Sequence, residues 1–280
     1  MKKFVWQILY FVFAITVVSF SPHVVQAATC SIATNTVIDQ AYVNAGSCDA
    51  INITASVSTT WIGTVDLQGA GTVTVNSGVT MTMGTSSAMV LGSTDDLIVN
   101  GRVAHTSSSM SGINITARNV TVAVGGMLDA SGMGCAGGIG GGVTDGYGPD
   151  TGTGICTVTT SGYGKTYRGG AAHGGSGGSN YGGTAGQTTT YDSSTNPSFL
   201  GAGGGGGNNA DENGGTGGGL IRLVVSGTFT INGSIKADGT SGVGGSYGAG
   251  GGAGGGIYIR TSVLAGSGTM TADGGVSGYL

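Results

Sequence analysis

Few residues of this chain carry side chains suited to acid–base chemistry, and most of them lie far apart in the sequence. Glycoside cleavage needs two positioned carboxyl groups, one as the acid and the other as a base or nucleophile. Asp95 and Asp96 form an adjacent acidic pair in a strand-and-turn context, and Arg102 and His105 follow shortly after. These four residues are the candidates if the chain cleaves polysaccharides. The simpler interpretation is that the two Asp residues are solvated turn residues and that His105 is an exposed turn histidine.

Other motif matches carry little weight in a glycine-rich chain. Gly-x-Gly-x-x-Gly strings arise from composition alone, and none of them opens a helix after a strand, so no dinucleotide cofactor is predicted. Asp211 and Glu212, with three neighbouring Asn residues, offer the hard oxygens that Ca²⁺ prefers. Because they lack the spacing of a known calcium loop, we interpret them as an exposed polar loop. The sequence predicts neither a metal nor a cofactor.

Composition excludes several classes of protein. The chain has 280 residues with 62 Gly but only 3 Pro, which is incompatible with a collagen repeat. Charged residues make up 8% of the chain, the formal net charge is −4, and no basic run is present, so nucleic-acid binding is disfavoured. Hydrophobic residues at 39% argue against ordinary charged disorder.

The first 27 residues have the pattern of an export signal. Lys2 and Lys3 precede an apolar run over residues 4–20, and the small residues Val25 and Ala27 stand where signal peptidase requires them. The apolar run is short for a retained membrane span. Because Cys30 lies close after the run, processing as a lipoprotein is a less favoured alternative. We expect cleavage after Ala27, a secreted or cell-surface location, and membrane contact only through the signal.

The four cysteines all follow the predicted cleavage site. An even number in an exported chain favours two disulfides, and three connectivities are possible. The simplest one pairs Cys30 with Cys48 and Cys135 with Cys156. Each local loop would then stabilise the fold by roughly 3 kcal/mol in the chain-entropy model.

Period-two alternation of apolar and polar residues dominates from about residue 50. The clearest runs are 72–75, 79–83 and 120–124, which are rich in Val, Thr and Met and are bounded by Gly, Asn and Ser. Such runs are typical of strands with one buried face. No stretch of ten residues after the signal has helical periodicity with helix-forming residues, so we predict an all-β protein.

One turn sequence recurs along these strands. Close copies occupy 126–132, 233–239 and 268–274, and looser copies begin at Gly78 and Gly101. Successive copies start 23, 25, 107 and 35 residues apart. This pattern favours a solenoid, with glycine-rich loops inserted in the two long intervals. A β-sandwich also has many short strands, but it does not readily repeat one turn sequence.

The glycine-rich stretch 133–219 separates two groups of predicted coils. It holds 32 glycines in 87 residues, so ordering it requires dense backbone contacts. Chains of the polyproline II type could lie side by side there, and a flexible linker is the alternative. The predicted organisation is a signal peptide at 1–27, an N-terminal cap at 28–57, β-solenoid coils at 58–132, the glycine-rich insertion at 133–219, and further coils with a short glycine-rich loop at 220–280.

Several stretches resemble known exported proteins. Residues 126–132, 196–207, 219–225, 254–260 and 268–274 are similar to the glycine-rich, right-handed β-helix segments of exported bacterial surface proteins of the adhesin type. The resemblance covers some 200 residues and implies an all-β fold, a right-handed parallel β-helix (β-solenoid) with glycine-rich loop insertions. Asp95 and Asp96 also resemble the acidic pair of polygalacturonase-like hydrolases, whose Gly-His-Gly and Arg-x-Lys motifs are missing here.

Together these features favour a structural or adhesin-like protein that presents glycine-rich loops for attachment or matrix assembly, and that is not an enzyme. The expected partners are glycans or other envelope proteins. The uncapped last coil indicates either that the chain is the N-terminal part of a longer protein or that this end stacks on a partner, for example in end-to-end self-association. A polysaccharide lyase or glycoside hydrolase on the same scaffold is the alternative. Aromatic side chains of the glycine-rich stretch are the candidate binding groups, although they could equally be packing anchors: Tyr163, Tyr167, Tyr181 and Tyr191.

Overall fold

The computed structural model describes residues 28–67, 69–141, 145–150, 155–157, 169–178, 186–245 and 248–278. The predicted signal peptide and three of the four candidate tyrosines (Tyr163, Tyr167 and Tyr181) lie outside these residues.

Two parallel sheets account for almost all regular structure, so the all-β prediction is confirmed. The ten-stranded sheet has the order β1 (Ala28–Ile32), β3 (Cys48–Ile53), β6 (Thr72–Val75), β9 (Asp96–Val99), β12 (Asn119–Val122), β16 (Leu220–Ile231), β11 (Ile113–Ala117), β8 (Met89–Leu91) and β5 (Thr64–Val65), and β18 (Gly256–Ala265) pairs with β16. The seven-stranded sheet has the order β19 (Thr269–Thr271), β17 (Ser234–Lys236), β13 (Met127–Asp129), β10 (Arg102–His105), β7 (Thr80–Met83), β4 (Val57–Trp61) and β2 (Thr36–Ile38).

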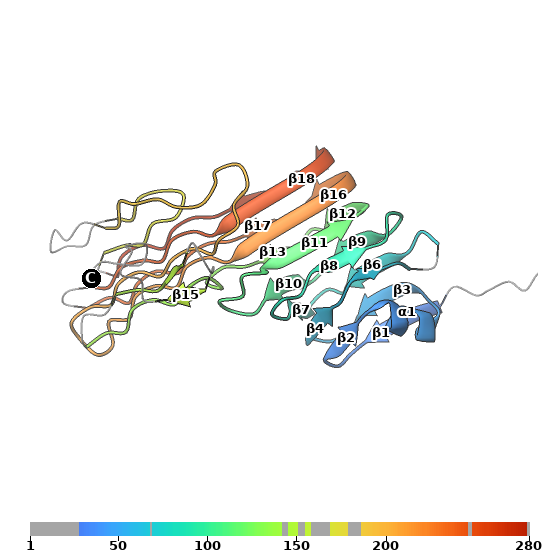
Figure 1. The fold of residues 1–280 in the computed structure, drawn as a ribbon, viewed down its shortest axis with the longest axis horizontal. Helices are drawn as coiled ribbons and strands as arrows, with labels where there is room; N and C mark the ends of the chain where they lie inside the picture. The colour runs from blue at the N-terminus through green and yellow to red at the C-terminus, as the bar shows by residue number, and fades with distance from the viewer. Residues whose placement is uncertain are drawn as a thin grey trace, which may run out of the picture.

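Strand neighbours in these sheets are successive passes of the chain, which Figure 1 shows as stacked tiers. In the seven-stranded sheet Thr80 pairs with Arg102 and Arg102 with Met127. The next pairs are Met127 with Ser234 and Ser234 with Thr269, which are 107 and 35 residues apart. The long intervals between the repeated turns therefore correspond to long excursions of the chain between adjacent strands.

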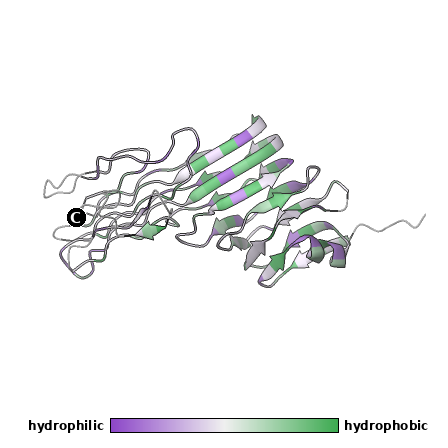
Figure 2. Ribbon diagram, in the orientation of Figure 1, coloured by the Kyte–Doolittle hydropathy of each residue, from purple (hydrophilic) through white to green (hydrophobic). Residues whose placement is uncertain are grey.

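The core is made of columns of side chains that continue from tier to tier. One column runs through Val73, Leu97, Val120 and Phe229, which are paired in register and fully buried. The alternating bands of apolar and polar residues along the strands are visible in Figure 2. The period of two in the sequence thus places one apolar face of each strand in the interior.

The beginning of the described chain carries the one α-helix among the described residues, which the sequence analysis did not predict. Helix α1 (Gln40–Gly46) begins where the Asp39 carboxylate accepts a hydrogen bond from the Tyr42 amide, and it ends at Ser47 in the left-handed conformation. Seven residues with a single buried side chain, Val43, are too short to give a helical period.

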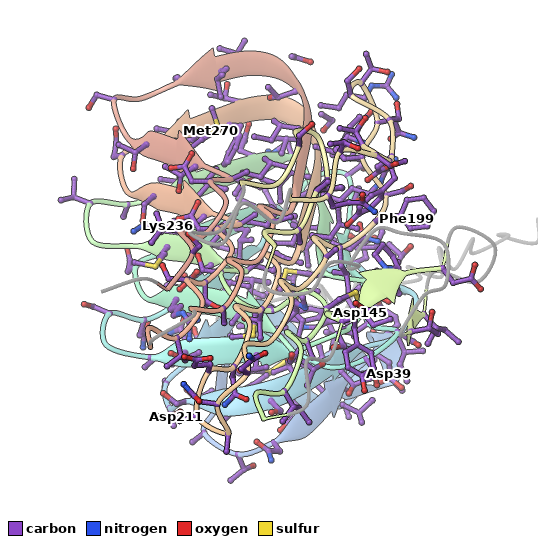
Figure 3. The ribbon with its side chains drawn as sticks, turned by 90° about the vertical axis from the view of Figure 1, so that its left-hand side faces the viewer. Asp39, Asp145, Phe199, Asp211, Lys236 and Met270 are labelled. Carbon is purple, nitrogen blue, oxygen red and sulfur yellow. A yellow bond between two sulfur atoms is a disulfide. The ribbon has the colours of Figure 1, made fainter. Side chains whose placement is uncertain are left out.

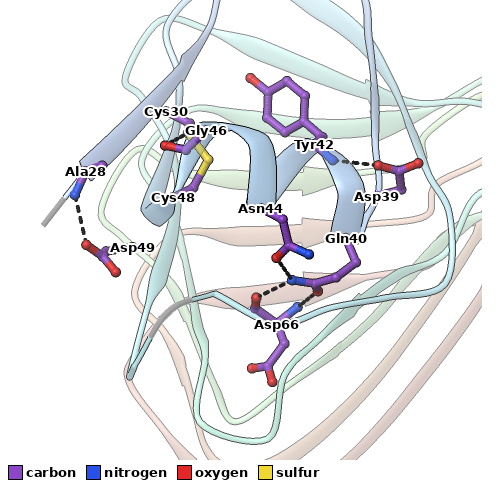
Figure 4. The surroundings of a disulfide bond; sticks show 10 residues. All are labelled: Ala28, Cys30, Asp39, Gln40, Tyr42, Asn44, Gly46, Cys48, Asp49 and Asp66. Carbon is purple, nitrogen blue, oxygen red and sulfur yellow. Dashed lines mark hydrogen bonds between the residues drawn. A yellow bond between two sulfur atoms is a disulfide. The ribbon is translucent and has the colours of Figure 1, made fainter.

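Both predicted disulfides are present. Cys30–Cys48 joins β1 to the start of β3 beside α1, as Figure 4 shows. Cys135–Cys156 ties the glycine-rich region to β15 (Cys156–Thr157), which pairs with β14 (Gly148–Pro149) in an antiparallel ribbon. Disulfides persist in oxidising compartments, so the pair fits an extracellular environment.

The glycine-rich segments lie side by side next to the sheets, on the left of Figure 1. We call residues 134–141, 201–207, 212–219 and 248–255 the glycine bundle. The central segment 201–207 exchanges backbone hydrogen bonds with five stretches of chain, through carbonyls or amides of residues 135–141, Tyr147, Gly169, 212–218 and 250–253. A strand in a flat sheet has only two such neighbours, so this packing is not a sheet.

The directions of these bonds repeat every three residues. The amides of Gly201, Gly204 and Gly207 all donate to segment 212–218, whereas those of Gly203 and Gly205 donate to two other stretches. Three residues per turn is the period of polyproline II, in which successive amides point about 120° apart. The interpretation of this region as side-by-side extended chains is therefore confirmed for the described residues.

Only glycine permits this spacing at the centre of the bundle. A Cβ atom at Gly217 would collide with the carbonyl of Gly201, and one at Gly204 would collide with the carbonyl of Gly250. Both obstacles are backbone atoms of neighbouring segments, which cannot turn aside as a side chain would. The glycine content that makes ordering costly is thus what allows the dense backbone contacts that offset the cost.

Candidate functional site

Asp95 and Asp96 are both engaged in holding the fold. The carboxylate of Asp95 is fully buried and accepts hydrogen bonds from the amides of Leu67 (2.8 Å) and Gly71 (2.9 Å) in the preceding tier. Asp96 makes a two-point ion pair with Arg118 at 2.8 and 2.9 Å. The hydrogen bond from Arg118 lowers the pKa of Asp96 below its usual value. A carboxyl group held in its ionised form is poorly suited to act as a general acid.

Arg102 and His105 lie on β10, in the other sheet. The Arg102 guanidinium forms an ion pair with Asp129 at 2.9 Å. No hydrogen bond or ion pair links Arg102 or His105 to Asp95 or Asp96, all of which the structure describes. The four residues therefore do not form one cluster of hydrogen-bonded groups.

The interpretation of His105 as an exposed turn residue is wrong. Its side chain points inward in the column formed with Met83 and Thr59, and the residue is 1% exposed. The Nδ1 atom lies 2.8 Å from the carbonyl of Thr106, and Nε2 abuts Gly219. Burial lowers the pKa of His105, which favours the neutral ring.

Glu212 also corrects the sequence analysis, because it is not part of an exposed loop. It is fully buried against Gly207 and Gly245, and its carboxylate accepts hydrogen bonds from the amide and side chain of Asn209 at 3.0 and 2.8 Å. Asp211 next to it is exposed. Within the described ranges, no group of three or more His, Cys, Asp or Glu side chains is placed to hold a metal ion.

Tyr191 is the one candidate tyrosine that the structure describes. Its ring packs beside His173 and Phe199, with ring centroids 4.7 and 6.4 Å away. Its hydroxyl donates to the carbonyl of Leu200 at 2.6 Å, and the residue is buried. Tyr191 thus joins the two ends of loop 186–200, and it packs in one apolar cluster with Ala202 and Ala253 of the glycine bundle. Phe199 at the edge of that loop is labelled in Figure 3.

Asp192 of the same loop and His173 outside it form a buried pair that was not predicted from the sequence. His173 Nε2 lies 3.1 Å from Asp192 Oδ2, and the two side chains are only 7% and 4% exposed. His173 Nδ1 lies 2.9 Å from the carbonyl of Gly254. Both ring nitrogens of His173 therefore lie within hydrogen-bond distance of an oxygen atom.

Asp192 is the centre of this network. Its carboxylate also accepts hydrogen bonds from the amides of Ser193, Ser198 and Phe199. Burial alone would raise the pKa of Asp192, but these bonds and the one from His173 outweigh it and lower the pKa to about 2. The signal in the sequence was an Asp followed by Ser residues, a common arrangement for a side chain that caps its own turn.

A cavity of about 680 Å³ opens beside this ion pair. It lies between residues 171–176 and 190–197 on the loop side and residues 253–257 and 272–274 of the neighbouring segments. The volume falls within the range of small-molecule sites, and its wall combines hydroxyl, carboxylate and apolar groups. We take this cavity as the candidate site.

Comparisons with known proteins give no match, whether with protein-family models, curated proteins or solved structures. No helix among the described residues is long and apolar enough to cross a membrane.

Proposed function

We propose that the chain is a secreted or cell-surface structural protein, adhesin-like in architecture, built as a right-handed parallel β-helix (β-solenoid) with glycine-rich insertions. The register of successive tiers supports the solenoid, because every neighbour in the two large sheets is parallel. Five strands of the seven-stranded sheet, β7, β10, β13, β17 and β19, each follow a copy of the repeated turn. Right-handed winding follows from the strong preference of parallel crossovers for that hand. The signal peptide predicted from the sequence and the two disulfides of the structure support the location.

The observation that carries the assembly part of this proposal is the exposure of apolar side chains in the last described tier. The column of Val120 and Phe229 continues to Leu264, which is 55% exposed. The column of Leu128 and Ile235 continues to Met270, which is 47% exposed. Side chains that are buried in every earlier tier are thus presented to solvent in the last described one.

The opposite end of the stack is covered. Helix α1 packs against β1, β2, β3 and β5, and its Val43 is fully buried. Figure 3 shows Met270 at one end of the molecule and Asp39, the cap of α1, towards the other. A head-to-tail stack of copies is therefore blocked by the helix.

The uncovered end also lacks the usual protection of an edge strand. Natural sheets block their edges with charge, Pro or bulges, yet β18 and β19 carry only one charged residue, Arg260, and no Pro. Two copies meeting at this end would pair their β18 edges and cover Leu264 and Met270. Each copy would bring one charged residue, Arg260, to the pair of edges. A closed, two-fold pair is thus the form of matrix assembly that we propose.

Light scattering on the signal-free chain tests this proposal. The double variant Leu264→Lys, Met270→Lys should be monomeric where the unchanged chain is dimeric, because each Lys loses apolar burial and adds repulsion. Val124→Lys is the matched control, since Val124 is 85% exposed on a turn away from that end. A chain that stays monomeric at high protein concentration, or equal loss of dimer in the control, would overturn the proposal.

A further inference from the structure

The cavity beside His173 and Asp192 has a lining suited to a sugar. The hydroxyls of Thr190 and Ser194 line it, are exposed, and have no hydrogen-bond partner among the described residues. Pro197 and Ile257 give it an apolar portion. Sugar rings present both hydroxyl groups and apolar C–H faces, so a wall of free hydroxyls and apolar patches matches them on both counts.

The charge of the lining restricts the class of sugar. The Asp192 carboxylate is held by His173 and by three backbone amides, and both ring nitrogens of His173 are already occupied. The remaining carboxylate of the wall is that of Asp273, which is exposed and has no ion-pair partner in the described chain. An unpaired carboxylate repels acidic sugars and attracts an amino group.

The wall is also held in place before any ligand arrives. The Asp192 carboxylate fixes the turn of residues 193–199 through the amides of Ser193, Ser198 and Phe199. His173 joins this turn to Gly254 of the glycine bundle. A site whose loop is already ordered loses less conformational entropy on binding.

We propose that this cavity binds a short neutral or amino-bearing saccharide and discriminates against uronic acids. The inference rests on the proposed cell-surface, adhesin-like role for its biological sense, but it does not depend on self-association. It assigns the loop of residues 190–197 a recognition role. The cavity includes Gly256 and Ile257 at the start of β18, whereas the assembly proposal concerns Leu264 near the end of that strand.

Titration calorimetry on the signal-free chain, with neutral, amino-bearing and uronic oligosaccharides of equal length, tests the inference. We expect binding of the first two classes and none of the third. Ser194→Trp should weaken binding at least about tenfold by occupying the cavity, since position 194 is exposed and needs no buried partner. Asp273→Asn should remove the preference for amino-bearing over neutral sugars, while Asp211→Asn, an exposed carboxylate outside the cavity, should leave it unchanged.

Two outcomes would overturn the inference: no binding of any neutral or amino-bearing saccharide at millimolar concentration, or binding that Ser194→Trp does not affect. Circular dichroism of each variant checks that the fold is retained. Light scattering of the same samples reports dimer formation separately, so a failed saccharide site and a failed assembly proposal give different results.

Discussion

At the scale of single residues, the chain uses its few charged side chains to hold backbone. Asp95 binds two amides of the tier below, Asp96 binds Arg118, and Glu212 closes the turn at Asn209. Asp192 accepts hydrogen bonds from three amides and contacts His173, and these contacts lower its pKa to about 2. Acidic residues that would be catalytic in a different setting are here part of the fold.

The lowered pKa of Asp192 predicts how the stability of the protein changes in acid. Its folded-state pKa of about 2 lies below the ordinary 3.8, so its contribution is present above about pH 4 and is lost as the pH falls towards 2. Asp192→Asn should destabilise the protein by on the order of 2 kcal/mol at neutral pH, because a neutral side chain binds the same amides less strongly. Thermal unfolding between pH 7 and pH 2 measures this.

The difference between Asp192→Asn and the unchanged protein should shrink at the acid end of that range. Asp211→Asn removes a charge at an exposed position and should show no such convergence. A constant difference across the pH range would contradict the role given to the Asp192 carboxylate.

Residue roles were the least predictable part of the molecule. The sequence identifies Asp95 and His105 as candidate residues, but only the stacking of the tiers determines that both side chains are buried. Likewise His173 and Asp192 meet because a turn at 192–199 folds back on the glycine bundle, a contact over 19 residues with no periodic signal. Local patterns record strand faces, whereas such pairings depend on how distant segments pack.

At the scale of elements, the sequence predicts the strands of the sheets much more clearly than the extended segments of the glycine bundle. The alternating runs and the repeated turn predict the strands and their register, because each tier must bury the same face against its neighbour. The glycine segments contain few side chains to carry a pattern, so the sequence alone left a flexible linker open as an alternative. In the structure these segments are ordered by backbone hydrogen bonds that repeat every three residues, which a sequence pattern of side chains cannot report.

The packing of the glycine bundle predicts that Gly→Ala substitutions at different positions change the stability of the protein by different amounts. Gly204→Ala places a methyl group against the backbone of Gly250 and should destabilise the protein by about 1–3 kcal/mol. Gly178→Ala, where a Cβ meets nothing within 4 Å, should be neutral or stabilise slightly by restricting the unfolded chain. Denaturant unfolding of the two variants measures both effects, and equal stabilities would argue against close packing at Gly204.

At the scale of the whole molecule, stability should vary along the stack. In a solenoid each tier contacts only its neighbours, so a tier with two neighbours opens less readily than one at an end. One end is closed by α1 and the Cys30–Cys48 disulfide, and the other presents Leu264 and Met270. The two ends should therefore open with different free energies.

Hydrogen exchange measured by mass spectrometry tests this gradient. Amides in β9 and β12 should exchange slowest, those in β1 and β3 should be intermediate, and those in β18 and β19 should exchange fastest in dilute protein. Raising the protein concentration should slow exchange in β18 alone if two copies pair at that edge, and Leu264→Lys, Met270→Lys should abolish this change. Uniform exchange along the stack would contradict tier-by-tier opening, because a single cooperative unit would protect every strand equally.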